Sequence, residues 1–213
     1  YSFYGVSVLA ELAENIEIFP YTAMWLRRTL FDASVIGPVP ASPTWTGEYI
    51  EWASENSGIS KAMKKNSGYE VLQGEGRFRG PLVGGCMEVL EMAKGTSLWP
   101  ALSAFDGSVL FLETSEEVPA PMYVEVGYEH GILGVLQRVN GILFCKPYQE
   151  KYYREYREVF KSVLAEFGLF DLPVVCNMSF GHNEPMCMLP YGAMCEFDCG
   201  KGTFSILDTG VVE

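Results

Sequence analysis

An acidic residue and a histidine each follow a short hydrophobic run in this sequence. Glu113 ends the run Ser-Val-Leu-Phe-Leu-Glu at 108–113, and His182 comes six residues after the run Leu-Pro-Val-Val-Cys at 172–176. A buried strand that ends in an ionisable residue places it at the carboxyl edge of a sheet, where open α/β sheets bind ligands. A carboxylate and an imidazole at one such edge can act as the orienting group and the general base of a hydrolase.

No serine or cysteine lies in a convincing nucleophile turn. Ser7, in Gly-Val-Ser-Val, lacks the second glycine of a nucleophile elbow. Ser179 is only three residues from His182 on the same segment, where it is suited to cap or turn the loop. The sequence therefore predicts part of an active site, with the nucleophile upstream of Tyr1. The absence of an initiator methionine agrees with a chain that has been cut, and we expect these 213 residues alone to be inactive.

Other candidate ligands are weaker. His130 falls within a predicted helix, which favours a structural role. Cys176, His182 and Cys187 could be combined into a metal site, but they lack a recognisable ligand spacing, so no metal or other cofactor is predicted.

Two glycine-rich segments could contact an anion. The pattern at 74–80 is one residue too long for a dinucleotide-binding motif and precedes a predicted strand instead of following one. Gly84 and Gly85 lie between a predicted strand and a predicted helix, where they either present backbone N–H groups to an anion or form a plain tight turn.

The composition is that of an ordinary globular protein, with 48% hydrophobic and 20% charged residues. A net charge of −12 argues against a nucleic-acid partner and against an anionic membrane surface, and no apolar stretch is long enough to span a bilayer. The six cysteines contain no C-x-x-C pair, and we expect free thiols in a reducing compartment. The N-terminal segment lacks a basic region, so we expect a cytosolic protein without a signal peptide.

Hydrophobic periodicity predicts alternating strands and helices, which become regular from about residue 71. The predicted strands are 1–4, 81–83, 108–113, 139–145, 172–178, 186–189, 194–197 and 203–207, with a hairpin turn at 199–202. The predicted helices are 20–32, 87–94, 122–133 and 149–167. Residues 34–70, with three early prolines, are predicted to form a long loop. This order indicates an α/β fold with a mostly parallel sheet and an antiparallel meander at its end.

Several short motifs occur in the order seen in a known family of serine peptidases. The motifs are, in chain order, Ser-Phe-Tyr-Gly at 2–5, Trp-Thr-Gly-Glu-Tyr-Ile-Glu-Trp at 45–52, Gly-Gly-Cys-Met-Glu-Val-Leu at 84–90, Gly95-Thr96, the strand ending in Glu113, Val-Asn-Gly-Ile-Leu-Phe at 139–144, Phe-Gly-His at 180–182 and Leu-Pro-Tyr-Gly at 189–192. In the last six of these motifs the chain resembles the LD-carboxypeptidases, and its first two motifs are most similar to the microcin C immunity peptidase branch of that family.

The resemblance implies a two-domain protein. A Rossmann-like N-terminal domain would carry the serine in a Gly-Tyr-Ser-Asp turn, and residues 1–33 would be its tail. Residues 34–70 would be a linker, and 71–213 a C-terminal domain of swivelling type. Glu113 would orient and stabilise His182, and His182 would be the general base. The resemblance also implies a homodimer.

The resemblance further implies a substrate-binding set made of Trp52, Trp45, Gly84, Gly85 and Cys86. Trp52 matches the position of an aromatic ring that stacks on a nucleobase in the microcin branch. Alternatively, both tryptophans pack the loop or lie in a dimer contact. Cys86 departs from the family's Gly-Gly-Asn, which removes or replaces an amide near the site.

Two functions follow from these observations. The first is a serine peptidase or amidase that cleaves either a murein peptide with an L-to-D bond or a peptidyl or aminoacyl nucleotide-like amide; the two tryptophans favour the second substrate. The alternative is a non-catalytic binding module that keeps the peptidase fold, which Cys86 slightly favours.

Overall fold

The centre of the protein is an eight-stranded mixed sheet with the order β2-β12-β11-β6-β7-β8-β9-β5. The computed structural model describes residues 2–116, 119, 127, 129–131 and 133–212. No helix in these residues is long and hydrophobic enough to cross a bilayer.

Four neighbouring strands of the sheet are parallel and form its most hydrophobic part. They are β6 (Arg77–Cys86), β7 (Val109–Glu113), β8 (Gly141–Cys145) and β9 (Val174–Met178). Every residue of β7, β8 and β9 is buried. Burial on both faces explains why these strands appear in the sequence as uninterrupted hydrophobic runs instead of alternating ones.

Antiparallel strands complete both edges of the sheet. On one side β6 pairs with β11 (Met194–Asp198), which pairs with β12 (Thr203–Thr209) through the predicted hairpin turn. On the other side β5 (Glu70–Gln73) pairs antiparallel with β9. The predicted class, α/β with a mostly parallel sheet and an antiparallel meander, is confirmed.

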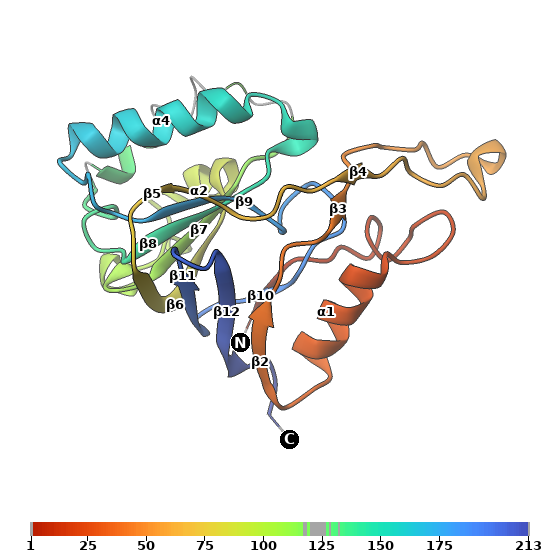
Figure 1. Ribbon diagram of the computed structural model, residues 1–213, viewed down its shortest axis with the longest axis horizontal. Helices are drawn as coiled ribbons and strands as arrows, with labels where there is room; N and C mark the ends of the chain where they lie inside the picture. Colours follow the sequence, from red (N-terminus) through yellow and green to blue (C-terminus); the bar gives the residue numbers. More distant parts are fainter. Residues whose placement is uncertain (1, 117–118, 120–126, 128, 132, 213) are drawn as a thin grey trace.

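Helices cover the two faces of the sheet (Figure 1). α2 (Met87–Ala93) and α4 (Tyr153–Glu166) share one hydrophobic core with β7, β8 and β9. On the other face Trp25 of α1 (Pro20–Leu30) belongs to a second core with side chains of β2, β6 and β12. This packing does not separate residues 1–33 from the sheet, and the division of the chain into domains stays a prediction.

The loop predicted over 34–70 contains secondary structure at its start and its end. Val35–Val39 forms β2, an edge strand that pairs with β12, so the prediction of a loop is wrong there. Gly37 and Pro38 are the reason that the sequence of this segment predicted a loop. An edge strand tolerates them, because the side of the strand that lacks the proline N–H donor can face solvent instead of a partner strand. Strand β5, which begins at Glu70, was also not predicted.

The rest of the loop is a long excursion closed by a short strand pair. β3 (Thr44–Trp45) pairs antiparallel with β4 (Lys64–Lys65), and residues 46–63 extend between them, away from the sheet (Figure 1). We refer to residues 46–63 as the ligand loop, because they contain Trp52, a predicted substrate-binding residue.

The elements predicted over 186–189 and 122–133 are found only in part among the described residues. The strand predicted over 186–189 is wrong except at its end, because only Leu189–Pro190 pairs, as β10, with β1 (Phe3–Tyr4). The four residues at 186–189 are all hydrophobic and buried, but the first three lie in a loop and not in a strand. The helix predicted over 122–133 lies mostly outside the described residues; 127 and 129–131 are helical.

Candidate functional site

The structure brings together the carboxylate and the imidazole found in the sequence. His182 Nδ1 lies 2.8 Å from Oε2 of Glu113. The carboxylate is buried, with 3% of its side chain exposed, whereas 36% of the His182 side chain is exposed. The contact occupies Nδ1, so Nε2 is the ring nitrogen that can reach a substrate or a nucleophile.

Glu113 and His182 are 69 positions apart in the sequence, and the parallel arrangement of the strands explains why they are in contact. Glu113 is the last residue of β7, and the His182 segment follows the end of β9, two strands away at the same carboxyl edge. Gly181 makes the close approach possible. Its φ is +99°, and a Cβ atom there would lie 2.6 Å from Oε2 of Glu113. A side chain at this position would therefore push the carboxylate away from the imidazole.

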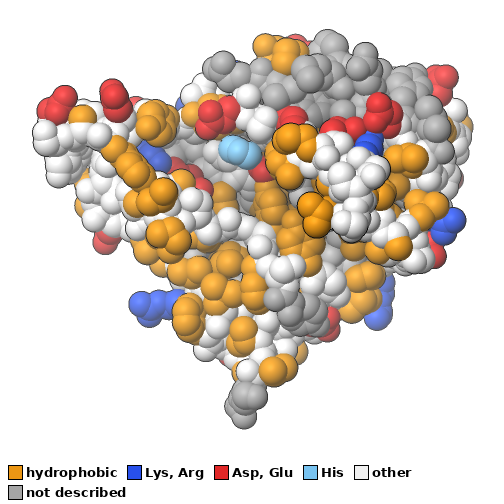
Figure 2. All heavy atoms as spheres, turned by 180° about the vertical axis from the view of Figure 1, so that it is seen from behind, with side chains coloured by type: hydrophobic (Ala, Val, Ile, Leu, Met, Phe, Trp, Pro, Cys, Tyr) orange, Lys and Arg blue, Asp and Glu red, His pale blue; other side chains and the backbone are white. Residues whose placement is uncertain are grey.

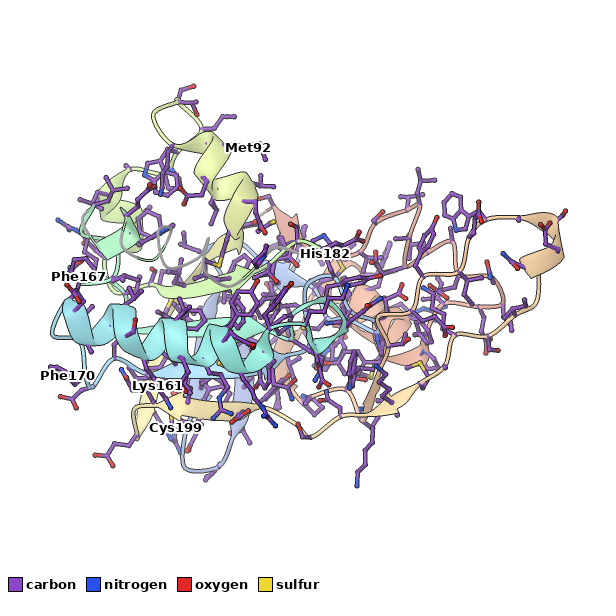
Figure 3. The ribbon with its side chains drawn as sticks, turned by 90° about the horizontal axis from the view of Figure 1, so that it is seen from above. Met92, Lys161, Phe167, Phe170, His182 and Cys199 are labelled. Atoms are coloured by element: carbon purple, nitrogen blue, oxygen red, sulfur yellow. The ribbon has the colours of Figure 1, made fainter. Side chains whose placement is uncertain are left out.

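A cavity of about 400 Å³ opens in front of the pair. One wall is formed by Gly181, His182 and Glu113, and the other by the N-terminal segment, including Tyr4 and Ser7. Figure 2 shows an exposed histidine between carboxylate and hydrophobic side chains, and it is His182 because His130 is only 3% exposed. In Figure 3, His182 lies between the body of the sheet and the side on which the ligand loop extends. We call this space the catalytic cavity, because the two catalytic residues predicted from the sequence line it.

Carboxylates dominate the electrostatics around the imidazole. The hydrogen bond to Glu113 raises the pKa of His182 above its usual value, partial burial opposes this shift, and the charges of Glu113, Glu116 and Glu88 add to it. Burial, together with the charge of the nearby Glu113 carboxylate, raises the pKa of Tyr4. Tyr4 was not among the predicted site residues; the only sequence signal for it is its place in the Ser-Phe-Tyr-Gly motif.

Cys86 lies beside the pair but is not suited to be a nucleophile. It is the residue of β6 that pairs in register with Glu113 of β7. Burial and a hydrogen bond from its Sγ to Glu88, at 3.1 Å, raise the pKa of the thiol to about 12. A thiol with such a pKa is not ionised at neutral pH, and the thiolate is the reactive form.

Gly84 and Gly85, the two glycines before Cys86, differ in how much space a side chain would have. A Cβ atom on Gly84 would lie 1.7 Å from the carbonyl oxygen of Phe111 in β7, so close strand packing requires glycine. Gly85 faces the hydroxyl of Tyr191 with more space. Neither glycine lines the catalytic cavity, and their binding of substrate stays a prediction.

The two predicted tryptophans have different environments. Trp52, on the ligand loop, is 57% exposed and lines a second cavity of about 280 Å³. Trp45 is 4% exposed, and the ammonium groups of Lys64 and Lys146 lie 4.6 and 4.4 Å from its ring centroid. The ring of Trp45 therefore packs the base of the ligand loop, and only Trp52 offers a free face to a ligand.

The other candidate ligands are dispersed. His130 is buried, with Nδ1 3.8 Å from Glu91, on the side of the sheet that carries α2 and α4. All six cysteines are free. Among the described residues, no group of three or more histidine, cysteine or acidic side chains is placed to hold a metal ion.

We expect His182 to titrate above 6.5, the usual histidine pKa, and Glu113→Gln to lower its pKa. The charged pair stabilises the fold below the unfolded-state pKa, and this contribution is lost as the pH rises through the higher folded-state pKa. NMR titration of the ring protons measures this, because the described chain has a single other histidine, the buried His130. An unchanged His182 pKa in the variant would contradict the assigned contact.

A carboxylate-bound imidazole at the carboxyl edge of an α/β sheet is the arrangement of a hydrolase acid–base pair. Comparison with known proteins identifies the family. Residues 79–197 match the model of the LD-carboxypeptidase C-terminal domain. The chain belongs to this family of peptidases, as its motifs predicted.

Two curated relatives are named as carboxypeptidases. A protein of Treponema pallidum, provisionally named a carboxypeptidase, is 26% identical over 78% of this chain and 47% of its own length. A similarly named protein of Streptomyces coelicolor is 32% identical over 62% of this chain and 40% of its own length. The chain thus spans about half the length of the curated relatives it matches.

One similar solved structure is an MccF-like protein from Streptococcus pneumoniae in complex with AMP, which is 26% identical to this chain, with a TM-score of 0.86. The match covers 98% of this chain and 64% of the chain of that protein. The microcin C7 self-immunity protein MccF in complex with aspartyl sulfamoyl adenosine shares the fold at 22% identity, with a TM-score of 0.83 over 98% of this chain and 61% of its own.

Proposed function

We propose that the full-length protein is a serine peptidase or amidase and that these 213 residues carry the Glu and His of its catalytic triad. The observation that carries this proposal is the 2.8 Å contact between His182 and the buried Glu113 at the edge of an open cavity. The serine is assigned to an upstream Rossmann-like domain, with residues 1–33 as its tail, 34–70 as a linker and 71–213 as the second domain.

The proposed reaction passes through an acyl-serine. Nδ1–H of His182 donates to Glu113, and Nε2 accepts the proton of the serine hydroxyl as the serine oxygen bonds to the amide carbonyl carbon. The C–N bond then breaks, and His182 returns the proton to the leaving amine. In the second half, Nε2 of His182 takes a proton from water as the water oxygen bonds to the acyl carbon. The ester C–O bond then breaks, His182 returns the proton to the serine oxygen, and the acid leaves.

Of the two substrate classes, we propose an amide linked to a nucleotide-like group. Trp52 supports it, because its exposed ring lines a cavity that shares Ala10 of the N-terminal segment with the catalytic cavity. The similar proteins solved with AMP and with aspartyl sulfamoyl adenosine support the same class. The test is to give the full-length protein an aminoacyl-nucleotide amide and a murein tetrapeptide. Cleavage of the murein peptide alone would overturn this choice of substrate, and cleavage of neither would overturn the peptidase.

Trp52→Ala in the full-length protein is expected to raise KM for the nucleotide-linked amide about 10- to 100-fold, because one stacked base contributes about 1–3 kcal/mol. Trp52→Phe keeps an aromatic face and serves as the matched control. Steady-state kinetics on this substrate, and on an amide without a nucleobase, separate stacking from a general defect. An equal loss on both substrates would contradict the stacking role.

A non-catalytic binding module is the second candidate. Cys86 supports it, because a neutral thiol stands where the family has an amide. The sequence upstream of Tyr1 discriminates the two: a Gly-Tyr-Ser-Asp turn supports the peptidase, and its absence supports the binding module.

A further inference from the structure

A buried ion cluster joins three segments that surround the two cavities. Lys61 Nζ, on the ligand loop, lies 2.5 Å from Oε1 of Glu14 and is also hydrogen-bonded to Oε2 of Glu184. Glu14 belongs to the N-terminal segment, and Glu184 is two residues beyond His182. The side chains of Lys61, Glu14 and Glu184 are only 15%, 8% and 9% exposed. Charges this well removed from water depend on one another, because each would be uncompensated if its partner were lost.

The ligand loop is attached to Glu184 at both of its ends. At its start, Thr46 N–H donates to the Glu184 carbonyl at 2.7 Å, and Glu184 N–H donates to the Thr46 carbonyl at 2.9 Å. Near its end, Lys61 binds the Glu184 carboxylate. Trp52 lies between these two attachments. The position of the Trp52 ring relative to His182 therefore depends on two contacts of Glu184, one with Thr46 and one with Lys61.

The third member of the cluster connects the loop to the wall between the cavities. Ala10 lines both the catalytic cavity and the cavity beside Trp52, so the segment that contains it separates the two. Glu14 follows on the same segment and lines the second cavity together with Lys61 and Trp52. The Lys61–Glu14 contact thus holds the loop against this wall.

Lys61 is placed to hold the loop and not to bind an anionic ligand. Its ammonium already contacts two carboxylates, so the cluster has no excess positive charge for a phosphate. Burial raises the pKa of Glu184 to about 7, with Glu14 adding to the shift and Lys61 opposing it. Without Lys61, two carboxylates would share one buried site and repel each other.

We propose that Lys61 is a positioning residue that fixes the ligand loop, and with it Trp52, relative to the His182 segment. The attachment itself is a property of this chain. Its consequence for catalysis rests on the proposed function, in which Trp52 holds the nucleotide-like part of the substrate while His182 acts on the amide.

The attachment is tested by hydrogen exchange of the full-length protein. Lys61→Met keeps the length of the side chain and removes its charge. Exchange of the Thr46 and Glu184 amides is expected to become about tenfold faster or more, because the loop opens locally while the sheet stays closed. Lys65→Met is the matched control, since Lys65 lies in β4 at the end of the same loop and is exposed. Unchanged exchange of both amides in Lys61→Met, or an equal increase in Lys65→Met, would overturn the proposal.

A milder variant covers the case in which Lys61→Met fails to fold. Glu184→Gln keeps the size and the backbone contacts of this residue and weakens only its link to Lys61. The same two amides are expected to exchange faster, and amides of β7 are expected to be unaffected. Unchanged exchange at Thr46 and Glu184 in this variant would equally overturn the attachment.

Kinetics test the functional consequence separately. Lys61→Met is expected to raise KM for the nucleotide-linked amide about tenfold, with little change for an amide without a nucleobase, because only the first substrate needs Trp52 in place. An equal loss on both substrates would overturn the positioning role. If the wild-type protein cleaves neither substrate, the proposed function fails, and hydrogen exchange still decides whether Lys61 holds the loop.

Discussion

Replacing His182 with alanine in the full-length protein is expected to lower kcat for amide hydrolysis about a million-fold, the size of effect seen when the base of a catalytic triad is removed. The reason is that one imidazole has two tasks in the proposed reaction. It accepts the serine proton during attack and returns it to the leaving amine, and neither water nor the buried Glu113 carboxylate can replace Nε2 in the catalytic cavity. The kcat of the purified variant measures the effect.

His130→Gln is the control for this experiment. His130 is the second histidine of the chain and packs on the opposite side of the sheet, beside α2 and the ring of Trp99. Its replacement is expected to leave kcat within about twofold at a temperature where the variant is folded, since a residue outside the site affects stability more than chemistry. Retention of a hundredth or more of the activity by His182→Ala would show that another group is the base.

The contact between Glu113 and His182 could be predicted from the sequence because Glu113 ends one of the most hydrophobic strands and His182 follows another. Glu113 ends a strand whose five residues are all buried, and such a run is visible without knowledge of the fold. The carboxyl ends of parallel strands share one edge of a sheet, so two strand-end residues become neighbours despite their distance along the chain. The 2.8 Å contact follows from that topology together with the glycine at 181.

The edges of the sheet could not be predicted for a complementary reason. β2 contains Gly37 and Pro38, and the strand that begins at Glu70 has no fully buried residue. Neither segment has the hydrophobic pattern of a central strand, and pairing with β12 or β9 makes each of them a strand. Tertiary context, and not local preference, decides such elements.

The roles of Trp45 and Lys61 depend on long-range contacts that spacing does not encode. Both tryptophans lie in one aromatic stretch of the sequence, yet Lys146, a hundred residues away, covers the ring of Trp45 and leaves Trp52 free. Lys61 lies in a polar stretch typical of a solvated loop. Its partner Glu184 is 123 residues away, so the cluster is visible only in three dimensions.

Glu113→Gln in the full-length protein is expected to lower kcat about 10⁴-fold with KM nearly unchanged, as when the carboxylate of a related triad is made an amide. The side chain is buried and accepts from Nδ1 of His182 at 2.8 Å. Glutamine fits the same space, but its amide can turn an N–H towards the ring, which favours the tautomer with the proton on Nε2. A proton there prevents His182 from accepting one from the serine, and no negative charge remains to stabilise the imidazolium.

Glu116→Gln separates this specific contact from the general field of carboxylates. Glu116 also raises the pKa of His182 through its charge, but its side chain is exposed, so water screens its effect. Its replacement is expected to change kcat less than about threefold, because an exposed charge interacts weakly. Equal losses in the two variants would mean that the total charge near His182, and not the buried contact with Glu113, activates the base. A larger loss in Glu113→Gln alone is the result that the geometry requires.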